Sequence, residues 1–209
     1  MSLQYEEKRI TEMEHMMSFN YDSGSFTALD NFDIKSTADS GGAFSGSVFI
    51  NERRMNDESC VSEGKYSIFD IADWFLLKSN MTHKKLQKLC YYAQAWCYAL
   101  RGYPLANTDF QAWSHGPVSP ALYERFKGFG YGTIRMKTAR TPAIEKEDEQ
   151  LLQDVWDTYG EMTGNALEAL SHRELPWIEA RKGYGEAERS SVVISAQSMK
   201  DYYKSIYLK

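Results

Sequence analysis

The stretch THKKLQKLCYYAQAWCYALRG, residues 82–102, decides the fold. Its apolar residues recur three and four positions apart over about five turns, which is the period of an amphipathic helix. The members of this stripe are Leu86, Leu89, Cys90, Ala93, Cys97 and Leu100. Thr82 is a favourable N-cap, and Gly102 supplies the left-handed residue that commonly ends a helix. The pattern predicts a central helix whose apolar stripe faces the core.

The opposite side of this predicted helix is basic and aromatic. It carries Lys84, Lys85, Lys88, Tyr91, Tyr98 and Arg101. One interpretation is a partner-binding face, for which the candidate contact residues are Lys84, Lys85, Lys88, Tyr91 and Tyr98. The other interpretation is structural, because lysine stems and half-buried tyrosine rings can cover apolar surface while their polar ends stay in water. The sequence leaves both interpretations open.

Helix signals continue on both sides of this stretch. Ser67, Ser119 and Ser195 can cap helices, and Pro120 and Pro176 suit a first helical turn. The expected helices span residues 67–78, 119–127, 147–159, 163–170, 176–183 and 195 onward, with an extended piece at 110–113. We therefore predict a mainly α fold, a compact bundle of about five to seven helices with minor β-structure.

Residues 1–66 differ in composition from the rest of the 209-residue chain. They hold 6 Lys and Arg against 12 Asp and Glu, a net charge of −6, whereas the whole chain has a net charge of −5. A short helix is expected at 5–17 and short strands at 25–29 and 47–50, separated by Gly, Ser and Asp. We expect a small β-rich or partly flexible N-terminal unit in residues 1–66, followed by a helical domain in residues 67–209.

The acidic front segment favours a basic protein partner over nucleic acid, because phosphate binding needs a basic surface. Its candidate contact residues are Glu6, Glu7, Glu12 and Glu14. Acidic segments also keep proteins in solution, so charge alone leaves a binding role open. No apolar run approaches the length of a membrane span, the start lacks a signal-peptide pattern, and the cysteines lack CxxC spacing. We expect a cytoplasmic protein with no membrane partner; the oligomeric state is not predicted.

The spacing of the polar residues in the sequence matches no catalytic or metal-binding motif. Ser114 and His115 are adjacent, so in an extended segment they point to opposite sides, and there is no GxSxG elbow. The histidines and cysteines lack zinc spacing, and GFGYG at 128–132 lacks the features of a phosphate-binding loop. We predict no enzyme activity, no catalytic residue, no metal and no cofactor.

Two turns that contain histidine remain to be explained. The first combines Trp113, His115, Gly116 and Pro117, and the second combines His172, Glu174, Pro176 and Trp177. Each histidine can fasten its loop to the core, because the two ring nitrogens can bond separate backbone groups. In the alternative interpretation both turns line one recognition surface, with Trp113 and Trp177 as anchors.

Residues 70–177 contain four motifs in this order: DIA with MTHKKLQKLCYYAQAW at 70–96, AWSHGPV at 112–118, Tyr123 with Phe126 and Gly130, and LSHRELPW at 170–177. Together they resemble the Panacea domain, a SocA/GepA-like, phage-associated family. DIA at 70–72 and MTHKKLQKLCYYAQAW at 81–96 are similar to the family's D-V-A and M-T-x-x-K-L-Q-K-L-x-Y-Y-A-Q-G-W. AWSHGPV at 112–118 resembles A-W-x-x-G-P-V, Tyr123, Phe126 and Gly130 follow as in the family, and LSHRELPW at 170–177 resembles L-x-x-T/S-H-x-E-x-P-W. Ala95 stands where the family often has Gly, and Ala suits a helix interior better than Gly. The resemblance covers about residues 67–207.

The resemblance implies an antitoxin of a toxin–antitoxin system, which binds and neutralises a cognate protein toxin encoded by the adjacent gene. Alternatives are a proteolytic adaptor that delivers the toxin to an ATP-dependent protease, and a phage-encoded inhibitor of a host defence protein. Added segments vary in such proteins, so residues 1–66 are expected to help select the toxin. The motif residues, some of which can serve the fold alone, are Leu86, Gln87, Lys88, Leu89, Tyr91, Tyr92, Trp96, Trp113, His115, Gly116, Pro117, Tyr123, His172, Glu174, Pro176 and Trp177.

Overall fold

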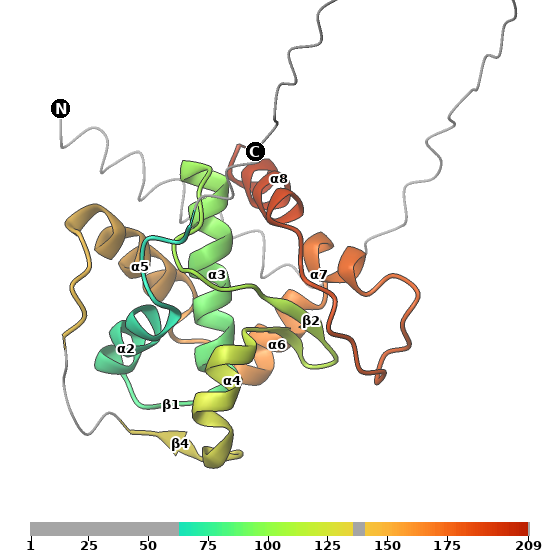
Figure 1. The fold of residues 1–209 in the computed structure, drawn as a ribbon, viewed down its shortest axis with the longest axis horizontal. Coiled ribbons are helices and arrows are strands. Elements are labelled where there is room, and N and C mark those ends of the chain that lie inside the picture. Colours follow the sequence, from blue (N-terminus) through green and yellow to red (C-terminus); the bar gives the residue numbers. More distant parts are fainter. Residues whose placement is uncertain (1–62, 136–140, 209) are drawn as a thin grey trace, which may run out of the picture.

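Helix α3, His83–Arg101, runs through the middle of the molecule, and the other elements lie around it (Figure 1). The structure, a computed structural model, describes residues 63–135 and 141–208. The other helices of these residues are α2 Ile68–Lys78, α4 Pro120–Phe126, α5 Lys146–Tyr159, α6 Gly164–Ser171, α7 Leu175–Ala180 and α8 Ala196–Tyr207. The predicted mainly α fold is confirmed, because seven α-helices form the described part of the chain. The helix, strands and acidic contact residues expected before residue 63 lie outside the described residues.

The predicted caps of the central helix are confirmed. The side chain of Thr82 accepts a hydrogen bond from the backbone N–H of Lys85, which satisfies one of the free donors at the helix start. At the other end Gly102 has φ +80°, and its N–H donates to the carbonyl oxygen of Tyr98 at 3.0 Å. A left-handed residue at this position favours glycine because it has no Cβ.

The burial of α3 differs from the expected single stripe. Leu86, Leu89 and Cys90 are buried as predicted, but Leu100 is 45% exposed, so its assignment to the core was wrong. Elements pack on several sides of the helix, namely α8, α6, α5, α2 and strand β3, Gly116–Val118. The basic and aromatic face is therefore covered over much of its length, and the helix behaves as a core element along most of its circumference.

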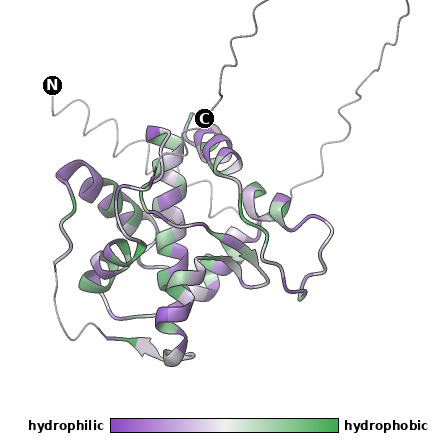
Figure 2. Ribbon diagram, viewed as in Figure 1, coloured by the Kyte–Doolittle hydropathy of each residue, from purple (hydrophilic) through white to green (hydrophobic). Residues whose placement is uncertain are grey.

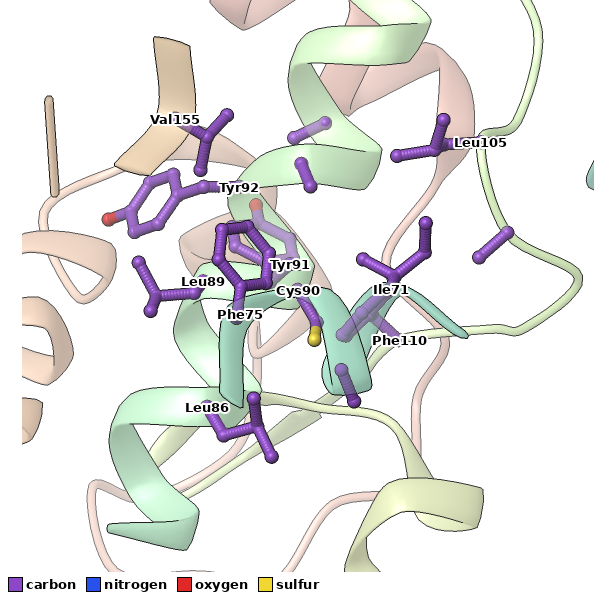
Figure 3. Packing of buried hydrophobic residues seen from close by; sticks show 14 of the residues in the cluster. Ile71, Phe75, Leu86, Leu89, Cys90, Tyr91, Tyr92, Leu105, Phe110 and Val155 are labelled. Atoms are coloured by element: carbon purple, nitrogen blue, oxygen red, sulfur yellow. The ribbon is translucent and has the colours of Figure 1, made fainter. Parts of the chain in front are cut away.

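The hydrophobic core surrounds α3, and one part of it lies between α2, α3 and α5. Figure 3 shows Ile71 and Phe75 of α2 beside Leu89 and Cys90 of α3, with Val155 of α5 nearby. Each of these side chains is almost fully buried, and burying one of this kind contributes roughly 1.5–3 kcal/mol. The hydropathy of the residues agrees with this packing. Helix α2, which packs on the core, is largely hydrophobic, whereas the first turn of α5 is hydrophilic (Figure 2).

Two small antiparallel sheets complete the described structure. Strand β1, Met81–Thr82, pairs with β4, Thr133–Ile134. Strand β2, Gln111–Trp113, pairs with β3 in a hairpin whose register places Trp113 opposite Gly116. The extended piece predicted at 110–113 thus corresponds to β2, and the following turn leads into the second strand.

The described domain includes contacts made by residues just before α2. Asp148 is fully buried at the start of α5, and its carboxylate forms ion pairs with Lys65 and Arg101. The hydroxyl of Tyr66 donates to the same carboxylate at 2.6 Å. The backbone of Tyr66 also exchanges hydrogen bonds with Leu105 and Asn107. Lys65 and Tyr66, which the sequence assigned to the N-terminal segment, therefore pack on the helical domain.

Candidate functional site

Lys88 lies in the interior and ties the β2–β3 hairpin to α3. Its side chain is 1% exposed, and its ammonium group donates to the carbonyl oxygens of His115 at 2.6 Å and Pro117 at 3.0 Å. Burial lowers the pKa of Lys88 to about 7, because the charged form loses its hydration, while the nearby Glu168 acts in the opposite direction. The placement of Lys88 on an accessible partner-binding face was wrong.

Tyr91 is a second correction to the predicted face. Its ring is fully buried and makes edge contacts with Phe110 and Tyr203, at centroid distances of 5.5 and 6.3 Å. A side chain in this position is enclosed by α8 and by the segment leading into β2. The sequence pattern could not show this, because helical periodicity reveals one apolar face but not whether further elements cover the others.

The turn of the hairpin is shaped to fit Lys88. Gly116 has φ +92°, a conformation that side-chain-bearing residues rarely adopt. A Cβ atom there would lie 2.7 Å from the Lys88 ammonium nitrogen and 2.9 Å from the hydroxyl oxygen of Ser171. Gly116 of the motif is thus required for the close approach of the hairpin backbone to α3 and α6, and Pro117 is buried beside it.

Two glutamines of α3 pair with passing backbone segments. The Gln87 amide donates to the carbonyl oxygen of Ser119 at 3.1 Å, and its oxygen accepts from the Ser119 N–H at 2.8 Å. Gln94 forms the same pair of hydrogen bonds with the backbone of Ala106, at 3.2 and 2.8 Å. Both amides are buried, so these bonds satisfy polar groups that would otherwise be costly to bury. The motif glutamines therefore position the chain before and after the hairpin.

The two histidine-containing turns meet in the folded domain. The indole N–H of Trp177 donates to the backbone carbonyl oxygen of Trp113 at 3.0 Å. The ring of His172 stacks on Trp177 at a centroid distance of 4.0 Å, with 14° between the planes. Burial lowers the pKa of His172, which favours the neutral ring. The two turns are thus in contact with each other, and the buried Trp177 ring joins them.

Glu174 lies deeper, among tyrosines of α3 and α8. Its carboxyl group accepts hydrogen bonds from the hydroxyls of Tyr203 at 2.7 Å and Tyr92 at 3.3 Å. Burial raises its pKa to about 8, and the two tyrosine hydrogen bonds only partly offset this effect. Tyr92 also stacks on Tyr159, whose hydroxyl accepts a hydrogen bond from the indole N–H of Trp96. The motif residues Glu174, Tyr92 and Trp96 therefore build the interior.

A charged cluster at the surface joins the hairpin to α6. The Nδ1 atom of His115, whose side chain is 76% exposed, lies 2.8 Å from a carboxylate oxygen of Glu168. Lys84 forms an ion pair with the other oxygen of this carboxylate and a hydrogen bond to Asn165. Burial acts to raise the pKa of Glu168, but the hydrogen bonds from Lys84 and His115 outweigh it, so the pKa lies below its usual value.

The remaining predicted contact residues are partly accessible. Lys85 donates to the carbonyl oxygen of Gly160 and lies over the ring of Trp156, and burial lowers its pKa. Tyr98 is half-buried. Tyr123 packs its ring against Trp113 at a centroid distance of 4.9 Å. Glu168 was not predicted as a site residue, because it lies outside the motifs. Nothing in the sequence indicates that it lies beside His115, which is 53 positions away.

The described residues show neither a metal cluster nor a membrane span. In residues 63–135 and 141–208, no group of three or more His, Cys, Asp and Glu side chains could hold a metal ion. No helix in the same part of the chain is both long enough and apolar enough to cross a membrane.

Residues 86–178 match the family described as "Antitoxin SocA-like, Panacea domain". The matched span begins in α3 and ends in α7, so it contains the hairpin and both histidine turns. This region is therefore a domain of the Panacea, SocA-like kind, as the resemblance of its motifs indicated. Antitoxin SocA of Caulobacter vibrioides (strain NA1000 / CB15N) is similar, being 28% identical over 131 residues that cover 57% of this chain and 70% of the relative. No solved structure matches the chain.

Proposed function

We propose that this protein is an antitoxin that neutralises a cognate protein toxin by binding it directly. The observation that carries the proposal is the match of residues 86–178 to the SocA-like antitoxin domain. The similarity to Antitoxin SocA over 131 residues supports the same role. We place the pair in the cytoplasm and expect the toxin to be encoded by the adjacent gene.

The geometry favours binding over catalysis. Lys88, Gln87 and Glu174, which are polar residues of the motifs, direct their hydrogen bonds inward to backbone or tyrosine groups. Such buried and satisfied groups stabilise a unique fold rather than contact a substrate. The function then falls to the surface that this scaffold supports, and a protein that acts by binding must be present in amounts comparable to its target.

The proposed contact surface has two parts. The first is the acidic segment within residues 1–66, with Glu6, Glu7, Glu12 and Glu14. The second is the accessible remainder of the α3 face, formed by Lys84, Lys85 and Tyr98. An acidic segment would steer the protein toward a basic toxin surface and speed association. We propose that residues 1–66 select the toxin, while residues 67–209 provide a rigid scaffold.

The test is co-expression with the product of the neighbouring gene in cells whose growth that product stops. Restored growth together with a stable complex in size-exclusion chromatography is the expected result. Restored growth with the toxin lost from immunoblots would instead indicate delivery to a protease. Restored growth at substoichiometric levels, with free and intact toxin, would contradict the proposal and indicate a repair enzyme.

A further inference from the structure

Residues 63–66, which we call the strap, lie against the loop that follows α3. None of these four residues is buried. The N–H of Tyr66 donates to the carbonyl oxygen of Leu105 at 3.0 Å, and its own carbonyl oxygen accepts from the N–H of Asn107 at 2.9 Å. The strap therefore runs parallel to this loop, with Tyr66 paired to Ala106. It is a short surface segment that joins residues 1–62 to α2.

Gly64 allows the close approach of the strap to the loop. A Cβ atom at this position would lie 2.0 Å from the backbone carbonyl carbon of Ala106 and 2.1 Å from the backbone nitrogen of Asn107. The loop backbone is held in place at this point, because the side-chain amide of Gln94 bonds both the N–H and the carbonyl oxygen of Ala106. Any side chain at position 64 would therefore lift the strap from the loop.

The carboxylate of Asp148 is the second attachment point. It is fully buried, and it accepts hydrogen bonds from the ammonium group of Lys65 at 2.7 Å and from the hydroxyl of Tyr66 at 2.6 Å. Lys65 also pairs with Glu145 at 2.6 Å, and the Glu145 N–H donates to the Tyr66 hydroxyl at 3.1 Å. Apart from the Tyr66 ring, which packs against the core, these attachments are polar, so water can replace them when the strap separates.

The domain keeps partners for its polar groups when the strap is detached. The cap of α2 does not depend on the strap, because the side chain of Ser67 accepts from the N–H of Phe69. Asp148 retains its ion pair with Arg101, which also donates to the carbonyl oxygen of Glu147 at 2.6 Å. The buried carboxylate is therefore not left uncompensated, which would be costly. Local opening of a surface segment is favoured under these conditions.

We propose that the strap opens and closes on the domain without global unfolding, with Ser67 as its hinge and Asp148 as the group that holds it closed. In the closed state residue 63 is fixed beside the loop after α3, so residues 1–62 are joined to the domain at a defined place. In the open state the tether between residues 1–62 and α2 is longer by four residues. The device goes beyond the proposed function, because it acts whatever partner the chain binds.

Native-state hydrogen exchange of the full-length chain, followed by NMR, measures the opening. The amides of Tyr66 and Asn107 report on the strap, and those of Leu89 and Tyr92, in the middle of α3, report on the core. The protection factors of the strap amides are expected to be lower by about tenfold or more, because local opening needs less free energy than global unfolding. Equal protection of strap and core amides would overturn the inference.

Gly64→Ala tests the fit of the strap on the loop. The added Cβ meets backbone atoms, so it should lower the protection of the two strap amides by about a further tenfold and leave α3 within about threefold. Trypsin cleavage after Lys65, detected as the fragment that begins at Tyr66, should be faster by a similar factor. Gly128→Ala is the matched control, because no atom lies within 4 Å of a Cβ placed there, and it should change neither quantity. Equal behaviour of the two variants would overturn the inference.

Asp148→Asn tests the group that holds the strap closed. The substitution keeps the shape of the side chain but removes its charge, and it should lower the protection of the strap amides by about tenfold or more. Asp157→Asn, at an exposed position of the same helix, is the control and should leave it unchanged. If Asp148→Asn lowers the protection of α3 equally, Tyr66→Phe decides, since it removes one hydroxyl at the surface. Protection of the Asn107 amide that stays unchanged in Tyr66→Phe would contradict the role of Asp148.

Discussion

The ammonium group of Lys88 lies 2.6 Å from the carbonyl oxygen of His115, a residue 27 positions further along the chain. A second bond, to Pro117, makes this lysine the point at which the hairpin turn attaches to α3. The resemblance to an antitoxin family singled out Lys88 as part of a motif, and the structure gives the physical reason for its presence. The amino group of Lys88 replaces water at two backbone acceptors that the turn leaves in the interior.

Lys88→Met keeps the length of the side chain but removes both hydrogen bonds. Two carbonyl groups then lack a donor in a buried position, and we expect the free energy of unfolding to fall by about 1–3 kcal/mol. Urea denaturation followed by circular dichroism measures this change. Lys146→Met, at an exposed lysine of α5, is the control and should shift it by less than about 0.5 kcal/mol. Equal effects of the two substitutions would contradict the attachment role.

Gly116→Ala tests the fit of the turn against α3. The substitution strains a backbone at φ +92° and brings Cβ within 2.7 Å of the Lys88 nitrogen. We expect a loss of more than about 1 kcal/mol of unfolding free energy. Gly128→Ala is the control, because no atom lies within 4 Å of a Cβ placed there. A Gly116→Ala protein as stable as the control variant would show that the turn can move away from Lys88.

The raised pKa of Glu174 predicts that the stability of the fold depends on pH. Its pKa in the folded protein, about 8, lies above its ordinary value of 4.5, so the fold favours the protonated form. The contribution of Glu174 is therefore fully present below about pH 4.5 and is lost as pH rises toward 8. Glu174→Gln keeps a neutral group and should remove this dependence.

Other groups titrate in the same range, so the comparison between the two proteins is the useful quantity. Burial lowers the pKa of His83, His172 and Lys88, so the stability that their neutral forms contribute is lost as pH falls, whereas that of Glu174 is gained. The stability of the unmodified chain relative to Glu174→Gln should fall by on the order of 2 kcal/mol between pH 5 and 7. Chemical denaturation at pH 5, 6 and 7 measures it, and a constant difference would refute the assignment.

The two histidines of the turns are expected to differ in their effect on stability. His115→Ala should change the unfolding free energy by less than about 0.5 kcal/mol, because the ring is largely in solvent. His172→Ala removes the stack on Trp177 and should lower it by about 1 kcal/mol. Both variants should still restore growth when expressed at matched folded levels. Loss of protection by both, with stability unchanged, would instead support an enzymatic role.

Charge reversal tests the acidic segment. Changing Glu6, Glu7, Glu12 and Glu14 to Lys should slow association with the toxin by about tenfold or more at low salt, and less at high salt. Stopped-flow kinetics at two ionic strengths measures the effect. The control makes the same change of charge elsewhere on the surface, at Asp157, Glu161, Glu186 and Asp201. Unchanged association and rescue in the first variant would exclude this segment from the contact surface.

Local signals in the sequence predicted the helices well. Caps such as Thr82 and Gly102 act within a few residues, so they are visible in the chain itself. The candidate face of α3 was predicted less well, because the burial of Lys88 and Tyr91 depends on the hairpin and on α8. These elements come much later in the chain, and hydrophobic periodicity carries no information about which polar side chains they cover.

The site shows the same division. The turns at residues 113–117 and 172–177 were singled out from their own residues, and the hydrogen bond from Trp177 to Trp113 shows that they are in contact. That they line one recognition surface stays a prediction. Glu168 was missed because its importance arises from three side chains brought together by different elements.

The two glutamine amides of α3 have a mechanical consequence. Gln94 holds the chain before β2, Gln87 holds it after β3, and Lys88 holds the turn between them. A force applied to the hairpin is therefore shared by three attachment points on one helix. Separation of the hairpin from α3, which lies in the centre of the fold, requires that the hydrogen bonds at all three points break. Force on this loop is therefore transmitted to α3 and, through it, to the hydrophobic core.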